Sequence, residues 1–239
     1  MGNATTSFAG RTWQLLELPA LLLVPTVMLA CAFLEVRATA LMTMMVTVAC
    51  LGLFLVGYDA SRPTLRQIMP TVVLASVAAA GRVLFAAVPD VKPVSAIAIV
   101  AGATLGRRQG FMTGALAALV SNVYFGQGAW TPLQMYAWGM VGYLAGVLSD
   151  AGAFRRPWAV YAWGFASALL YGAVLNGWHV LGFLRPLTWQ TALAAFVAGV
   201  PLDIVHGAAT VAFLVLIWAG WRRAIERVVG KYDLGSARQ

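Results

Sequence analysis

The sequence predicts an all-α integral membrane protein, and two observations support this prediction. First, 61% of the 239 residues are hydrophobic and only 10% are charged, with a mean hydropathy of +0.82. Such a composition leaves too few polar side chains to cover the surface of a soluble domain. Second, eight apolar segments recur along the chain, and most of them reach the roughly 20 residues that cross a bilayer core. They lie at about 15–34, 38–57, 69–88, 93–106, 110–123, 132–149, 157–176 and 191–219.

The first segment is expected to be a retained membrane span. It contains MLAC ending at Cys31, which imitates the end of a processed signal sequence. The apolar run at 15–33 is too long for the hydrophobic region of a signal peptide, and it leads through Glu35 and Arg37 directly into the second segment. Cys31 and Cys50 lie in separate segments, so neither a disulfide nor a zinc site is predicted.

The fourth and fifth segments are short, and they can form one long helix, two short spans or a re-entrant pair. The basic residues bear on this choice, because Lys and Arg gather on the cytoplasmic side of membrane proteins. With eight segments and an inside amino terminus, only Arg37, Lys92 and Arg185 lie outside. The cytoplasmic side then holds twelve basic residues, namely Arg11, Arg62, Arg66, Arg107, Arg108, Arg155, Arg156, Arg222, Arg223, Arg227, Lys231 and Arg238. A fused helix would move the last seven of these outside, so we expect both termini inside and leave the other two alternatives open.

Three parts are predicted: an N-terminal helical pair at 1–66, a six-helix core at 67–221 and a basic cytoplasmic tail at 222–239. The first two segments carry almost no polar residues that could form a site, so the pair looks separable. Small residues at helical spacings let helix backbones approach closely in lipid. The core contains such residues at Gly102, Gly106, Gly110, Gly114, Gly139, Gly142 and Gly146. The basic runs are interpreted as topology determinants and lipid-headgroup contacts, and no nucleic acid partner is expected.

Three predicted outer loops, at 88–93, 123–132 and 176–189, have an unusual content of aromatic and amide side chains. Aromatic residues at these positions can form an interfacial belt. The loops, however, also carry amides, a histidine and glycines, which together are typical of a ligand mouth. Both interpretations stay open. The candidate binding residues in and beside these loops are Lys92, Asn122, Tyr124, Gln127, Trp130, Asn176, Trp178 and His179.

Few polar side chains lie inside the spans, and these are further candidates for substrate binding. An unpaired cation such as Arg82 costs on the order of 3 kcal/mol within a bilayer, so it needs a partner or a polar ligand. Asp203 and His206 share one helix face in the last segment, and Asp203 is the expected counter-charge of Arg82. Gln134 and Trp138 present an amide and an indole to one side of the sixth segment.

Several motifs of catalytic proteins are absent from the sequence. It has no G-x-x-x-x-G-K-[ST] phosphate loop, no H-E-x-x-H, no G-x-S-x-G and no Cys/His cluster. We therefore expect a binding protein rather than an enzyme, with no catalytic residue, no metal site and no catalytic cofactor. A proton-coupled secondary transporter that uses Asp203 and His206 is the alternative, and a membrane-embedded enzyme that uses the same pair is a third possibility.

The core resembles the substrate-binding S component of energy-coupling factor (ECF) transporters. The resemblance covers about 69–219 and is strongest in the runs RVLFAAVPDVKPVSAIAIVAGATLGRRQGFMTGALAALVSN from Arg82, GQGAWTPLQMYAWGMVGYLAG from Gly126 and PLDIVHGAAT from Pro201. It implies a six-helix bundle in the bacterial cell membrane that captures a vitamin from outside. It also implies three partners: a transmembrane coupling subunit and two cytoplasmic ATPases.

Within the family, the SN…G.G.WTP.QM.AWG pattern is most similar to members that take up cobalamin or related corrinoids. Another B vitamin or a queuosine precursor stays possible as the transported ligand. The first core helix of the family carries an Ala-x-x-x-Ala face that meets the coupling subunit, and Ala75 and Ala79 match it here. The two N-terminal segments depart from the family pattern, and they either shield the core or bind another subunit.

Overall fold

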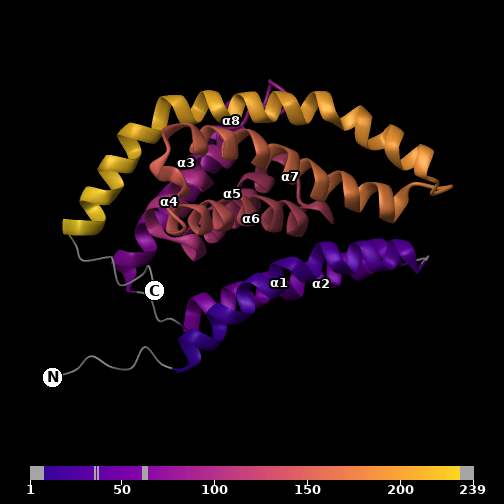
Figure 1. The fold of residues 1–239 in the computed structure, drawn as a ribbon, viewed down its shortest axis with the longest axis horizontal. Helices are drawn as coiled ribbons and strands as arrows, with labels where there is room; N and C mark the ends of the chain where they lie inside the picture. Colours follow the sequence, from indigo (N-terminus) through magenta and orange to yellow (C-terminus); the bar gives the residue numbers. More distant parts are fainter. Residues whose placement is uncertain (1–7, 35, 37, 61–63, 232–239) are drawn as a thin grey trace.

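The computed structural model describes residues 8–34, 36, 38–60 and 64–231, and in this part of the chain helices joined by loops form all of the regular secondary structure, with no strand (Figure 1). The predicted all-α class is therefore confirmed for these residues. The α-helices are α1 (Phe8–Phe33), α2 (Thr39–Ala60), α3 (Leu65–Leu84), α4 (Val94–Leu105), α5 (Arg107–Phe125), α6 (Trp130–Asp150), α7 (Pro157–Phe183) and α8 (Trp189–Lys231). A short 3-10 turn at Ala153–Arg155 connects α6 to α7.

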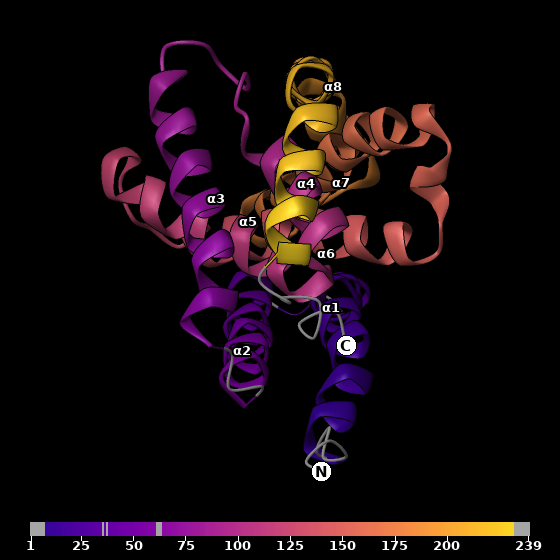
Figure 2. The ribbon, with the colours of Figure 1, turned by 90° about the vertical axis from the view of Figure 1, so that its left-hand side faces the viewer.

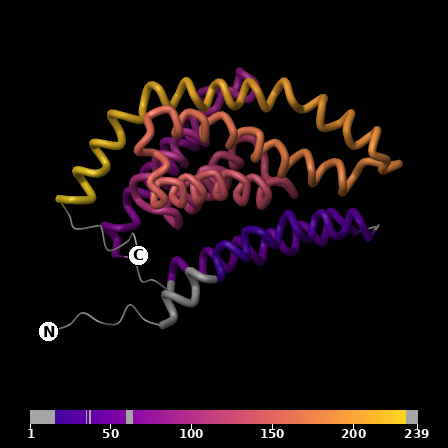
Figure 3. The backbone as a smooth tube through the Cα atoms, in the orientation of Figure 1, coloured from indigo at the N-terminus to yellow at the C-terminus, as the bar shows by residue number. Residues whose placement is uncertain are grey.

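Five of these helices, α1, α2, α3, α7 and α8, are long and apolar enough to cross a membrane. Their outward faces carry large apolar side chains, such as Leu22, Met45, Val73 and Leu216, as lipid-facing surfaces require. The protein is therefore a multi-pass membrane protein. The α8 helix runs along the whole bundle and curves at its end (Figure 3). It continues to Lys231, so the predicted tail from 222 begins within this helix.

The short helix α4 lies at the centre of the core, with α3, α5, α6 and α8 around it (Figure 2). All of its residues except Ala103 are buried. Twelve residues rise by only about 18 Å, which is less than the roughly 30 Å of a bilayer core. Because protein covers α4 on all sides, its apolar character reflects the interior of the bundle rather than contact with lipid.

A sharp break at Gly106 separates α4 from α5. Gly106 has a φ of 105°, a backbone conformation that favours glycine. The two helices fold back on each other, so that Gly102 and Gly110 come into contact. One fused helix over the fourth and fifth segments is therefore excluded, as predicted from the basic residues.

The glycines of the core bring α5 and α6 into very close contact. A Cβ atom at Gly142 would overlap the backbone of Gly110, and one at Gly114 would overlap the backbone at Trp138. A Cβ at Gly146 would overlap the backbone of Arg107. The interpretation of these glycines as packing contacts is confirmed.

The helices α1 and α2 run side by side beneath the core (Figure 1), and they are joined to it by polar contacts. Glu17 of α1 is only 3% exposed, and it accepts hydrogen bonds from Arg108 of α5 and, at 3.2 Å, from Tyr143 of α6. The hydroxyl of Tyr136 donates to the carbonyl oxygen of Leu21 at 2.6 Å. A buried ion pair and a shared apolar core therefore join the N-terminal pair to the other helices.

The predicted partner face of α3 is turned into the bundle. Ala75 and Ala79 are 3% and 4% exposed, because the side of α3 that carries them packs against α4 and α5. Close packing by small residues does occur here, but it occurs within the chain. The prediction that Ala75 and Ala79 form an accessible contact for another subunit is corrected accordingly.

The burial of Ala79 determines the expected result of Ala79→Leu. The larger side chain overpacks the interior, so we expect the free energy of unfolding to fall by about 1–3 kcal/mol, measured by thermal unfolding in detergent. Ala80→Leu is the matched control, since Ala80 is exposed on the same helix and its substitution should leave the melting temperature nearly unchanged. Normal stability of Ala79→Leu would contradict the packing described here.

Candidate functional site

Within the core lies a small polar cavity of about 110 Å³. Its walls come from α3, the α3–α4 loop, α6, α7 and α8. The side chains that line it are Arg82, Asp90, Lys92, Gln134, Trp138, Tyr171 and His206. Five of these seven are predicted site residues, and the structure adds Asp90 and Tyr171.

Arg82 lies in the last turn of α3 and is 7% exposed. Its Nη1 donates to Ser121 Oγ at 2.7 Å and to Asn122 Oδ1 at 2.6 Å, both on α5. Two aromatic rings lie against the guanidinium, with their centroids 4.5 Å (Phe125) and 4.8 Å (Trp138) from Cζ. Such cation–π contacts offset part of the cost of a buried charge.

The predicted ion pair between Arg82 and Asp203 is not formed. Among the described residues, the salt bridges join other side chains, Arg108 to Glu17 and Arg222 to Glu226. The carboxylate of Asp203 lies against Gly172, where α8 crosses α7. The absence of a side chain at Gly172 leaves room for it there, so Asp203 packs between two helices and does not line the cavity.

A hydrogen-bonded group at the ends of α5 and α6 holds Arg82 in place. Asn122 Nδ2 donates to Thr131 Oγ1 at 3.0 Å and to Gln134 Oε1 at 2.8 Å. Gln127 accepts from the Thr131 hydroxyl at 2.9 Å and donates to the carbonyl oxygen of Leu119 at 3.0 Å. Asn122 and Gln127, both predicted binding residues, therefore position the site, and Gln134 lines the cavity itself.

His206, Ser95 and Trp138 form a second buried group in the wall of the cavity. Trp138 Nε1 donates to Ser95 Oγ at 3.1 Å, and Ser95 Oγ lies 2.8 Å from His206 Nε2. Because the indole N–H can only donate, the hydroxyl proton of Ser95 is free to reach Nε2 of His206. Tyr171 packs against both rings, with centroid distances of 4.7 Å to Trp138 and 5.2 Å to His206. This wall is therefore aromatic and rigidly held.

The α3–α4 loop closes the cavity with two charged residues. Asp90 has a φ of 55°, a left-handed conformation that Asp tolerates better than most residues. Lys92 Nζ donates to the carbonyl oxygens of Phe85 at 3.1 Å and Val88 at 2.8 Å. Burial raises the pKa of Asp90 and lowers that of Lys92, and the opposite charge of the other residue acts against each shift. Lys92 thus ties the loop to the end of α3.

The remaining predicted site residues lie away from the cavity. Tyr124 and Trp130 are 66% and 46% exposed at the ends of α5 and α6. The segment predicted as an outer loop at 176–189 is helical as far as Phe183, which places Asn176, Trp178 and His179 on α7. Asn176 lies against Gly199 of α8, Trp178 donates to the carbonyl oxygen of Ala40, and His179 stacks beside Phe183. The structure does not bring these five residues together.

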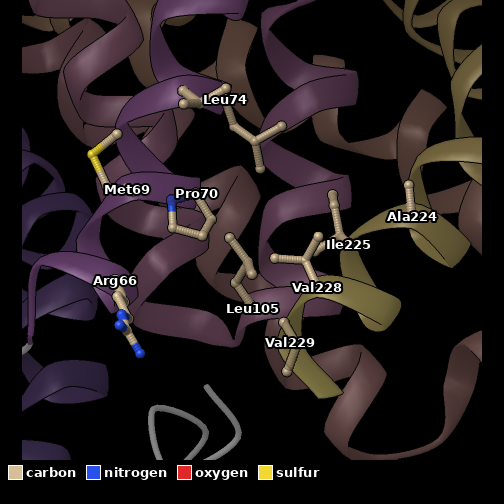
Figure 4. A pocket seen from close by; sticks show the side chains of 10 residues that line it. Arg66, Met69, Pro70, Leu74, Leu105, Ala224, Ile225, Val228 and Val229 are labelled. Carbon is tan, nitrogen blue, oxygen red and sulfur yellow. The ribbon is translucent and has the colours of Figure 1, made fainter. Parts of the chain in front are cut away.

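A larger groove of about 480 Å³ lies between α3 and the end of α8 (Figure 4). Apart from Arg66, the side chains that line it are apolar, among them Leu74, Leu105, Val228 and Val229. Such a surface suits alkyl chains and offers little to orient a polar molecule. The small polar cavity is therefore the better candidate for a specific site.

No protein-family model, curated protein or solved structure matches the chain. The function must therefore be inferred from the cavity itself. Its chemistry, a guanidinium, an amide, an imidazole and aromatic rings, suits the binding of a small polar molecule. No group of three or more potential metal ligands lies among the described residues.

Proposed function

We propose that this protein is the substrate-binding membrane subunit of an ECF-type importer and that it captures a small polar nutrient in the cavity beside Arg82. The observation that carries the proposal is a polar, charged cavity within an otherwise apolar helical bundle, since ionisable groups inside membrane proteins most often mark substrate pathways. In this proposal a transmembrane coupling subunit and two cytoplasmic ATPases supply the energy. The bacterial cell membrane is the proposed location. The proposed partners and the proposed location both rest on the resemblance of 69–219 to S components.

The volume of the cavity bears on the nature of the vitamin. At about 110 Å³, the cavity is well below the roughly 300–1,000 Å³ of typical small-molecule pockets. A corrinoid would therefore require large movements of the α3–α4 loop and of the segment that joins α5 to α6. A smaller B vitamin or a queuosine precursor would require less movement.

The cavity also bears on the alternative of a proton-coupled transporter. That mechanism needs Asp203 and His206 to exchange protons with one transport pathway. Only His206 lines the cavity, whereas Asp203 packs against Gly172. The geometry therefore favours capture of a ligand over a proton relay through this pair.

The proposal is tested by purifying the full-length protein in nanodiscs without ATP and identifying co-purified small molecules by mass spectrometry. We expect a vitamin-like compound that rebinds to the emptied protein, and uptake in cells that requires separate ATPases. Uptake that persists after loss of those ATPases would support the secondary transporter. Recovery of a chemically altered compound would support an enzyme.

Replacing Trp138 with phenylalanine tests the position of the ligand. The substitution keeps an aromatic ring but removes the hydrogen bond to Ser95, so we expect the co-purified compound to rebind five- to tenfold more weakly, or about 1 kcal/mol. Isothermal titration calorimetry measures this change. Trp158→Phe is the control, because Trp158 is 63% exposed at the start of α7. Equal affinities of the two variants would place the ligand elsewhere.

A further inference from the structure

We infer, building on the proposed function, that the captured molecule carries a carboxylate and that this group pairs with Arg82 inside the cavity. The inference concerns the chemical class of the substrate. It follows from the charges around the cavity and from the hydrogen bonds that Arg82 makes and leaves unmade.

The positive and negative charges of the side chains that line the cavity do not cancel. Arg82 and Lys92 are cations, and among the described residues Asp90 is the single carboxylate that lines the cavity. Lys92 and Asp90 are close enough to influence each other's ionisation, and the ammonium group of Lys92 is already engaged by two backbone carbonyls. Within the described part of the chain, Arg82 has no carboxylate at salt-bridge distance. The positive charge of Arg82 is therefore the one left without a counter-charge.

The hydrogen bonds of Arg82 leave the Nε atom of the guanidinium without a partner. Nη1 is occupied by Ser121 and Asn122, whereas Nε is buried without a hydrogen-bond partner in the described structure. Phe125 and Trp138 lie against the guanidinium group and supply no hydrogen-bond acceptor to Nε. Nε and Nη2 share the edge on the other side from Nη1, and two parallel N–H donors of this kind match the two oxygens of a carboxylate.

An unsatisfied donor on a buried cation is costly, and buried polar atoms are usually hydrogen-bonded. A neutral ligand would supply an acceptor but no counter-charge, and a cationic ligand would add to the repulsion. A carboxylate supplies both the acceptors and the charge. Gln134, Tyr171 and His206, which line the same cavity, are then left to contact the rest of the molecule.

The inference is tested with matched pairs of probes. The two members of each pair differ in charge but hardly in size. Nicotinate is compared with nicotinamide, and benzoate with benzamide, by calorimetric titration of the full-length protein in nanodiscs of zwitterionic lipid. Millimolar concentrations suffice to detect dissociation constants of about 1 mM. We expect each carboxylate to bind at least about tenfold more tightly than its amide, because hydrogen bonds to charged groups are the stronger ones.

Two variants with opposite expected effects show whether the preference for a carboxylate over its amide arises at Arg82. Arg82→Gln, which retains hydrogen-bonding capacity without the charge, should weaken carboxylate binding at least about tenfold and remove the preference over the amide. Asp90→Asn should strengthen carboxylate binding a few-fold, because it removes a negative charge from the wall, and Asn tolerates the left-handed backbone of residue 90. Arg223→Gln is the control. It removes one positive charge, as Arg82→Gln does, but at an exposed position, so it should leave the affinities for the carboxylate and the amide unchanged.

The outcomes separate this inference from the proposed function. If the co-purified compound is neutral or cationic, and Arg82→Gln leaves its affinity unchanged, the carboxylate inference fails while the proposed function stands. If nothing co-purifies and neither member of either pair binds, both fail. Should Arg82→Gln not fold, Asp90→Asn decides, since weaker or unchanged carboxylate binding by that variant overturns the inference.

Discussion

Gly142→Ala is expected to prevent the accumulation of folded protein. The added Cβ would overlap the carbonyl group of Gly110 on the facing helix, and backbone atoms cannot rotate away as a side chain can. Overpacking of a well-packed interior typically costs 1–3 kcal/mol. Because this overlap involves backbone in the most extensive helix pair of the core, we expect a loss of about 3 kcal/mol or more. The yield of monodisperse protein after detergent extraction, together with its melting temperature, measures the effect.

Gly220→Ala is the matched control for this substitution. Gly220 lies on α8 with no atom within 4 Å of an added Cβ. Alanine is a better helix former than glycine by about 1 kcal/mol, so this variant should be as stable as the wild type or more stable. A Gly142→Ala protein with a wild-type melting temperature would show that α5 and α6 are not packed as described.

Glu17→Ala is expected to have a similarly large effect. It removes the carboxylate that pairs with Arg108, whose side chain is only 13% exposed. An uncompensated buried charge costs about 3–5 kcal/mol, so we expect a large fall in the free energy of unfolding and a looser attachment of α1 and α2. Thermal unfolding and limited proteolysis between α2 and α3 measure these two effects.

Two further variants show whether the charge is responsible. Glu226→Ala removes the carboxylate of an exposed pair on α8, and such pairs contribute at most about 0.5 kcal/mol. Replacing Glu17 and Arg108 together with leucine should recover much of the stability lost in Glu17→Ala, because an apolar pair needs no compensation. If the double variant is as unstable as Glu17→Ala, the loss has a cause other than the orphaned charge.

The sequence predicted which residues form the candidate site better than it predicted which of them contact each other. Arg82, Gln134, Trp138 and His206 stand out because polar or amphipathic residues are rare inside apolar segments. Asp90 lies beside Lys92 in a loop that the sequence already marks as unusual, so it could have been selected on that ground. Tyr171 could not, because no local pattern distinguishes it from Tyr161 or Trp163 on the same helix.

The sequence by itself determined that this is a helical membrane protein, where most of its helices lie, that the chain breaks between the fourth and fifth segments, and that glycines pack its core. These properties depend on composition and on spacing within single segments. Lipid-facing and interior residues are both apolar in a bilayer, so the rotation of each helix is not encoded by a polar face. Only the tertiary structure decided that Ala79 points inward, that Glu17 meets Arg108, and that Arg82 contacts Ser121 and Asn122 instead of Asp203.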